Sequence, residues 1–217
     1  MDSTGLLLLF RSEMSDVAEP YLWSDEEVLS YIDDAQKMFC RKTEGIPDDL
    51  TPAITQLAVP AGADRIALSP LLRRIRSARR HDNGRPVEVI SEEEMVKRNW
   101  AFDGRPGIIK ALVLGAGRHS ARIYPAADAA TQIDLVVFRM PLTAINDADQ
   151  ALEVDEEHHR HLLLWCKHLG YSKHDVETYD KAKAAEFEVR FLGYCAAVTE
   201  EERRKRHKTR VVQYGGL

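Results

Sequence analysis

The prolines of this 217-residue chain are gathered in its middle. Eight of the nine lie between Pro47 and Pro141, where they separate short runs rich in β-branched residues. Because a proline inside a helix removes a hydrogen bond and clashes with the preceding turn, this stretch cannot hold long helices. Short β-branched runs bounded by turn residues are typical of strands. We therefore expect a β-rich middle section between helical ends.

Within the middle section, seven runs predict strands and one segment predicts a helix. Ser91 followed by Glu94 has the spacing of a capping box, in which each side chain binds the other residue's backbone amide. The helix that starts there is expected to reach about Trp100. We expect an antiparallel sheet or a small sandwich, with strands at residues 54–59, 65–68, 72–78, 87–90, 108–114, 121–124 and 133–139.

Helical periodicity marks the N-terminal end of the chain. Apolar residues at helical spacing predict a first helix over about residues 4–16, and Pro20 breaks that pattern. Ser24 and Glu27 form a second capping-box pair, which predicts the start of the next helix. Gly45 and Pro47 are expected to end that helix.

The C-terminal third returns to helical periodicity. A helix is predicted after Asp155, and Gly170 is expected to stop it. Ser172 is expected to open the next helix. Thr199 with Glu202 has the spacing of a last capping box, followed by the tail of the chain.

Together these patterns predict an α+β fold. Residues 1–46 and 150–202 are expected to form a helical bundle from the N- and C-terminal helices. Residues 47–149 are expected to form an inserted antiparallel β-rich domain with one short helix, and residues 203–217 an extended C-terminal arm.

The predicted arm differs from the rest of the chain in charge. It carries six Lys or Arg residues and no acid, whereas the whole chain has a net charge of −5. A basic segment without an amphipathic period is either disordered or folds on a partner, and its charges suit an acidic protein surface or a nucleic acid. Its candidate binding residues are Arg203, Arg204, Lys205, Arg206, Lys208, Arg210, Val211, Val212 and Tyr214.

A second basic region lies in the middle section, over residues 72–81. If this run is a strand, Arg74 and Arg76 share one face, while Arg73 and Ile75 share the other. Such charges can simply keep a strand edge from aggregating. They can also contact the acids of a neighbouring subunit, and the candidates for this contact are Arg73, Arg74, Arg76 and Arg79.

The chain shows no pattern typical of an enzyme or of a metal site. His158 and His161 have a spacing that zinc can use, but the His-Glu-x-x-His order of a metalloprotease is absent. Cys166 shares a face with apolar residues, which indicates core packing rather than a nucleophile. We expect no catalytic residue, no metal and no cofactor. The remaining histidines of this segment are His159 and His168.

Two features of the sequence indicate the cellular compartment of the protein. The three cysteines, Cys40, Cys166 and Cys195, are widely spaced without a C-x-x-C pair, which predicts buried reduced thiols in a reducing compartment. The apolar run at residues 6–10 is far too short to span a bilayer. We therefore expect a soluble protein that is not exported and has no membrane partner.

Four segments, taken in order, resemble the head-to-tail adaptor (connector) proteins of tailed bacteriophages, especially short-tailed ones. The resemblance covers roughly residues 6–195. The segments are a helical entry at residues 16–36, which includes Trp23-Ser24-Asp25-Glu26, the strand and turn Arg122-Ile123-Tyr124-Pro125-Ala126-Ala127-Asp128, the strand at residues 133–139 with Pro141-Leu142, and a helical hairpin at residues 156–187.

The resemblance implies a structural virion protein of the neck, between capsid and tail, that is present in the host cytoplasm during assembly. Such adaptors form a ring, in this case a dodecamer, beneath the portal protein and present a platform to the tail nozzle or tube. Genomic DNA passes through the ring without specific binding. In related adaptors a C-terminal arm reaches into the portal, and the segment from Arg203 would be that arm.

Two other functions remain open on the sequence alone. The basic tail could bind DNA, in which case binding should weaken steeply with salt. The chain could also be a cell-wall hydrolase carried in the neck.

Overall fold

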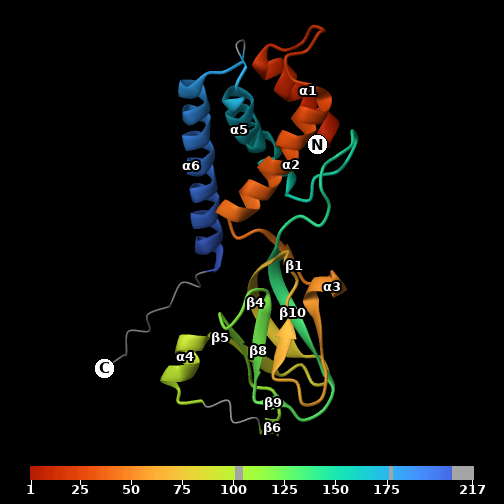
Figure 1. The fold of residues 1–217 in the computed structure, drawn as a ribbon, viewed down its shortest axis with the longest axis vertical. Coiled ribbons are helices and arrows are strands. Elements are labelled where there is room, and N and C mark those ends of the chain that lie inside the picture. Colours follow the sequence, from red (N-terminus) through yellow and green to blue (C-terminus); the bar gives the residue numbers. More distant parts are fainter. Residues whose placement is uncertain (101–104, 176–177, 207–217) are drawn as a thin grey trace, which may run out of the picture. The chain divides into compact units, whose positions relative to one another are not determined.

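The computed structural model describes residues 1–100, 105–175 and 178–206 (Figure 1). The chain divides into two compact units, one formed by Met1–Thr43 with Thr143–Leu217 and the other by Glu44–Leu142. The first unit is helical and the second is β-rich, so the predicted α+β class is confirmed. The β-rich unit begins and ends earlier in the chain than the expected range 47–149.

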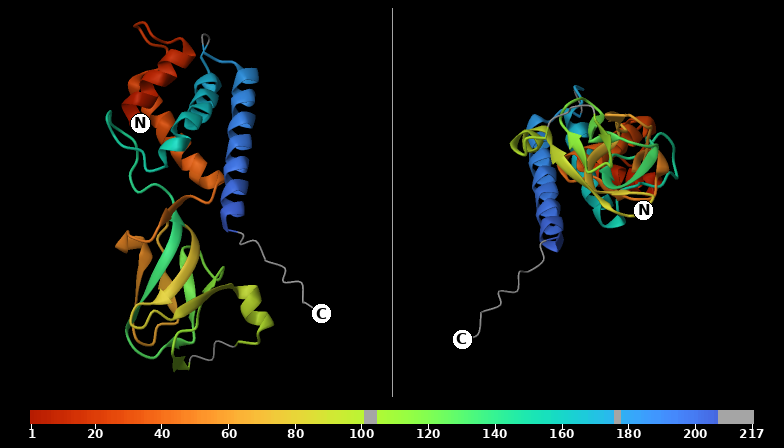
Figure 2. Two further views of the ribbon diagram at one scale, coloured as in Figure 1. Left: turned by 180° about the vertical axis from the view of Figure 1, so that it is seen from behind. Right: turned by 90° about the horizontal axis from the view of Figure 1, so that it is seen from below.

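Four long helices make up the described part of the helical unit. Helix α5 packs against each of the other three, and its most extensive packing is with α6, which runs beside it in both views (Figures 1 and 2). The helices are α1 (Ser3–Met14), α2 (Asp25–Lys42), α5 (Glu156–Ser172) and α6 (Lys181–Arg206).

The predicted start of α2 is confirmed. The Ser24 side chain accepts a hydrogen bond from the Glu27 amide, and the Glu27 carboxylate accepts one from the Ser24 amide. This capping box satisfies two amides that have no partner inside the helix. The face that follows, including Val28, Ile32 and Phe39, is buried as the periodicity predicted.

The expectation that α5 stops at Gly170 is wrong, because the helix continues to Ser172. A β-carbon at Gly170 would lie 3.3 Å from the Phe10 ring and 3.4 Å from the Met14 methyl group of α1. The glycine therefore allows α1 and α5 to approach closely. A helix stop and a close helix contact give the same sequence signal, which explains the error.

The expected helix boundaries at Ser172 and Thr199 are also wrong. Ser172 is the last residue of α5, and its hydroxyl donates to the His168 carbonyl at 2.7 Å. Thr199 lies inside α6, where its hydroxyl donates to the Cys195 carbonyl at 2.8 Å. Serine and threonine make such backbone bonds within helices as well as at caps, so the capping-box spacing was misleading here.

A buried ion pair joins α1 to the start of α2. The Arg11 guanidinium donates to the Asp16 carboxylate at 2.8 Å and to the Trp23 carbonyl at 3.1 Å, and it also contacts Asp25. Asp16 in turn accepts the Leu22 amide at 2.9 Å. Because the side chains of Arg11 and Asp16 are 5% and 2% exposed, each charge depends on the other for compensation.

The β-rich unit is built on one curled sheet of eight strands. Its order is β1-β10-β4-β5-β7-β8-β3, with β2 paired to another part of β10. These strands are β1 (Ile46–Asp48), β2 (Gln56–Val59), β3 (Arg65–Ala67), β4 (Leu72–Arg80), β5 (Pro86–Ser91), β7 (Ala111–Leu114), β8 (Ser120–Tyr124) and β10 (Thr131–Arg139). A separate pair joins β6 (Pro106–Gly107) to β9 (Ala126–Ala127).

All seven predicted runs contain strand, but two expectations need correction. The sheet is not wholly antiparallel, because β5 and β7 pair in parallel. Helix α4 (Glu92–Lys97) lies in the crossover that such a pair requires. In addition, residues 54 and 55 belong to the short helix α3 (Pro52–Thr55) rather than to a strand, since Pro52 suits the first turn of a helix.

The core of this unit lies inside the curl of the sheet. Alternate residues of the strands point inward, so that Ile75, Leu112, Ile123, Ile133 and Leu135 are all buried. This alternation is the period expected of strands with one face on a core.

Asp48 and Arg139 form a second buried ion pair, where β1 meets β10. Asp48 accepts hydrogen bonds from the Leu50 amide at 2.8 Å, the Thr51 amide at 2.9 Å and the Thr51 hydroxyl at 2.6 Å, and from the Arg139 guanidinium. Burial alone raises the pKa of Asp48, but the bonds from Thr51 and Arg139 outweigh it and hold this pKa well below the usual range. One carboxylate thus fixes both the strand pair and the turn that follows.

We expect Arg11→Met to destabilise the protein by about 3 kcal/mol, because it leaves the buried Asp16 carboxylate without a cation. Urea unfolding at neutral pH measures the change. Arg160→Met is the matched control, since Arg160 is 76% exposed and its contact with Glu13 is long, at 3.9 Å. Equal losses for the two variants would contradict a structural role for the buried pair.

We expect Asp48→Asn to lower the free energy of unfolding at pH 7, and the deficit to shrink as the pH falls below about 4. A carboxyl with a lowered pKa contributes stability above the pKa of the unfolded chain and loses it on acidification. Thermal unfolding of wild type and variant between pH 7 and pH 3 gives the comparison. Asp49→Asn, at the exposed neighbouring position, should have little effect at either pH; a deficit for Asp48→Asn that does not change with pH would contradict the assignment.

Candidate assembly surfaces

Alternation along β4 leaves Arg74 and Arg76 exposed on either side of the buried Ile75, and a bulge exposes Arg73 as well. Across the ladder to β10, Ser77 pairs with Val136 but Ile75 with Val137, so Arg76 has no opposite residue. Arg73, between Arg74 and Leu72, likewise has no opposite residue in β10. Each bulge resets the alternation of the strand. The expectation that Arg73 shares a face with Ile75 is therefore wrong, since Ile75 is buried and Arg73 is exposed.

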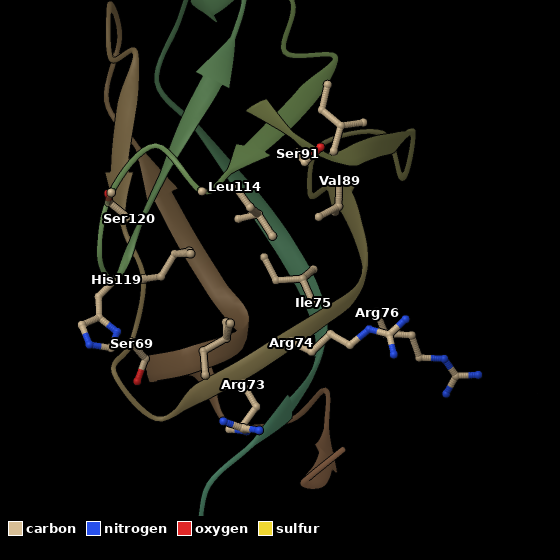
Figure 3. A pocket seen from close by; sticks show the side chains of 15 residues that line it. Ser69, Arg73, Arg74, Ile75, Arg76, Val89, Ser91, Leu114, His119 and Ser120 are labelled. Carbon is tan, nitrogen blue, oxygen red and sulfur yellow. The ribbon is translucent and has the colours of Figure 1, made fainter. Parts of the chain in front are cut away.

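A pocket of about 580 Å³ opens where β4 and β5 separate (Figure 3). The two strands pair only at Ala78–Val87 and Arg79–Pro86, near one end of each. Beyond that point β5 pairs with β7 instead, and no other described strand pairs with the rest of β4 on this side. We call this space the β4–β5 pocket.

The β4–β5 pocket has an apolar floor and a basic rim. Ile75, Val89 and Leu114 point toward one another at its centre, while Arg74 and Arg76 extend away from them (Figure 3). Arg74 donates to Glu44 at 2.7 Å. Within the part of the chain that the structure describes, no ion pair engages Arg76.

The structure brings together three of the four arginines proposed for a subunit contact. Arg73, Arg74 and Arg76 line the pocket, but Arg79 does not. Arg79 lies opposite Asp134 in the ladder between β4 and β10. The pKa of Asp134 is lowered by the hydrogen bond from Gln132, then by His81 and by the charge of Arg79.

A second surface, absent from the sequence-based candidates, is the turn after β1, residues 48–51, which we call the Leu50 turn. Leu50 is 83% exposed, more than any other large apolar side chain in the described residues. Asp49 beside it is also exposed. The signal was present in the sequence as one leucine inside the polar run Asp48-Asp49-Leu50-Thr51, but a lone surface leucine is common and carries little information.

The first residues of the predicted arm are helical, because α6 continues through Arg206. Arg203 and Arg204 pair with Glu200 at 3.7 and 3.2 Å. Lys205 pairs with Glu201 at 3.1 Å and Glu202 at 2.8 Å, and these two acids raise its pKa. The three basic residues are therefore matched by acids one turn earlier. Lys208, Arg210, Val211, Val212 and Tyr214 lie outside the described residues.

The histidines of α5 pack against neighbouring elements. His158 lies 2.8 Å from the Tyr194 hydroxyl of α6, and His161 stacks on the same ring. Burial lowers the pKa of both imidazoles, so they are neutral at pH 7. His159 binds the Val154 carbonyl and His168 the Ala184 carbonyl. These contacts give the histidines a structural role in holding α5 in place.

All three cysteines are buried, as predicted, and they form no disulfide among the described residues. Burial raises the pKa of the Cys195 thiol to about 11, and it also raises that of Cys166. Both are therefore thiols rather than thiolates at neutral pH, and a thiol is a poor nucleophile.

None of the helices in the described residues is long and apolar enough to cross a membrane. No curated protein matches the chain. The family model described as SU10 adaptor protein matches residues 1–213, nearly the whole chain. The two-unit α+β fold is compatible with that match. The chain therefore belongs to the SU10 adaptor protein family, a family of phage head-tail adaptors that act as structural proteins in the neck of the virion.

Proposed function

We propose that this adaptor assembles as a ring, a dodecamer, that docks on the portal protein and offers an attachment platform to the tail nozzle or tube. The observation that carries the proposal is the family match over residues 1–213. The ring extends the channel through which genomic DNA passes, and copies join it from the host cytoplasm during assembly. Its action is geometric and needs no covalent chemistry.

The two units differ in net charge, and this difference supports different roles for them in the ring. The helical unit has 23 acidic and 16 basic residues, a net charge of −7, whereas the β-rich unit has 12 acidic and 14 basic residues, a net charge of +2. An acidic surface forgoes attraction to phosphates, so DNA can slide past it. We assign the helical unit to the channel wall and the basic strand β4, with Arg73, Arg74, Arg76 and Arg79, to contacts between subunits.

The portal contact is assigned to the end of the chain. Since Arg203, Arg204 and Lys205 are paired with acids on α6, the net positive charge begins at Arg206. The residues from Arg206 to the end add Lys208 and Arg210 without any acid. Basic side chains would meet acids of the portal, and Val211, Val212 and Tyr214 would supply apolar contacts. Repetition around a ring compensates for the modest affinity of each copy.

A truncation that ends at Arg206 tests the portal contact and keeps α6 whole. Mixed with the cognate portal and imaged by electron microscopy, the full chain should form a ring beneath the portal, and the truncation should not. Lys208→Gln with Arg210→Gln, in the full-length chain, separates charge from length and should weaken docking as well. Rings from the truncation would keep the adaptor function but reject the arm. No ring from the full chain would contradict the proposed function.

The same proteins test the rival function in DNA binding. A complex that depends on phosphates should be lost between low and physiological salt, because bound counterions are released. We expect no salt-sensitive DNA complex of the full chain, measured with duplex DNA in mobility-shift titrations from low to physiological salt. Binding at low salt that collapses toward physiological salt and is absent from the truncation would favour the DNA-binding function.

A further inference from the structure

We propose that the Leu50 turn of one copy inserts into the β4–β5 pocket of the next copy, and that this contact links the β-rich units around the ring. The inference deepens the proposed function and rests on it. It names the partner of the pocket as a second copy of this chain, and it names the residue that the partner contributes.

The Leu50 turn is rigid enough to act as an inserted element. The Asp48 carboxylate binds the amides of Leu50 and Thr51 and is itself held by Arg139. The turn thus presents an almost fully exposed leucine at little cost in ordering. Pre-organised apolar side chains of this kind act as anchors in protein interfaces.

The pocket complements the turn in shape and in charge. Its floor of Ile75, Val89 and Leu114 is apolar, and its volume of about 580 Å³ leaves ample room for a leucine side chain and part of its turn. On the rim, Arg76 has no ion pair among the described residues. The exposed Asp49, next to Leu50, has the opposite charge. Insertion of Leu50 against the apolar floor, with Asp49 beside Arg76, would fill the pocket and compensate the charge of Arg76.

The register of the sheet places the two surfaces at the same level and on opposite sides of β10. Asp48 of β1 and Ile75 of β4 both pair with Val137, one from each side. Two views of the β-rich unit likewise show α3, which follows the Leu50 turn, on the side away from β5 (Figures 1 and 2). Two different patches on opposite sides make a head-to-tail contact, and such a contact closes into a ring when the rotation between neighbouring copies divides a full turn.

Disulfide trapping tests the contact. Asp49→Cys with Arg76→Cys keeps Leu50 in place and puts one thiol on each surface, while the native cysteines are buried. After assembly on the cognate portal and mild oxidation, a non-reducing gel should show a ladder of covalent oligomers. Asp49→Cys with Val96→Cys is the matched control, since Val96 is 68% exposed on α4. This variant should run as a monomer on the same gel.

The outcomes of this experiment distinguish failure of the contact between copies from failure of the adaptor function. A ladder with the first pair only supports the contact. Rings in the electron microscope without a ladder overturn the contact but leave the adaptor function intact. If the unmodified chain makes no ring on the portal, the proposed function fails and the contact fails with it.

Single substitutions give an independent measure. Leu50→Asp should raise the protein concentration needed for ring formation at least about tenfold, with an unchanged thermal midpoint because the side chain is exposed. Leu8→Asp, at a 60% exposed leucine of α1, is the control and should have a smaller effect. Asp49→Arg and Arg76→Asp should each weaken assembly, and the two together should restore it. Unchanged assembly by Leu50→Asp would overturn the proposal.

Discussion

The β-rich unit depends on the buried pair of Asp48 and Arg139. These side chains are 4% and 10% exposed, and between them they join β1 to the end of β10 and close the turn that follows. Gly45 is part of the same constraint. Its φ of 95° is in the left-handed region, and a β-carbon there would lie 2.6 Å from the Arg139 carbonyl oxygen. Only glycine lets the chain enter β1 so close to β10.

From this point β10 organises the sheet. It pairs with β1 and β2 along one edge and with β4 along the other, so that its position sets the register of these three strands. The bulge at Arg73 turns this side chain to solvent beside Arg74 and Arg76, and the early separation of β4 from β5 opens the pocket next to them. The surfaces proposed for assembly are thus consequences of strand register rather than of isolated side chains.

The sequence predicted this fold best where one physical signal had one meaning. The Ser24 and Glu27 pair marked a real helix start, and the β-branched runs between prolines marked real strands. The prediction from the sequence failed where one pattern is compatible with two different structures. Gly170 allows close packing against Phe10 instead of ending α5, and Thr199 bonds back inside α6 instead of capping it. The bulges at Arg73 and Arg76 could not be predicted, because they depend on pairing with a strand some sixty residues later.

The candidate surfaces followed the same pattern. The arginines on β4 were found from their clustering in the sequence, whereas the pocket beside them and the Leu50 turn required the three-dimensional arrangement. A cryo-electron microscopy reconstruction of the full chain bound to its cognate portal tests the account most directly. The account predicts a closed ring in which each Leu50 turn lies in the β4–β5 pocket of the next copy. Separate copies on the portal, with these surfaces open to solvent, would contradict it.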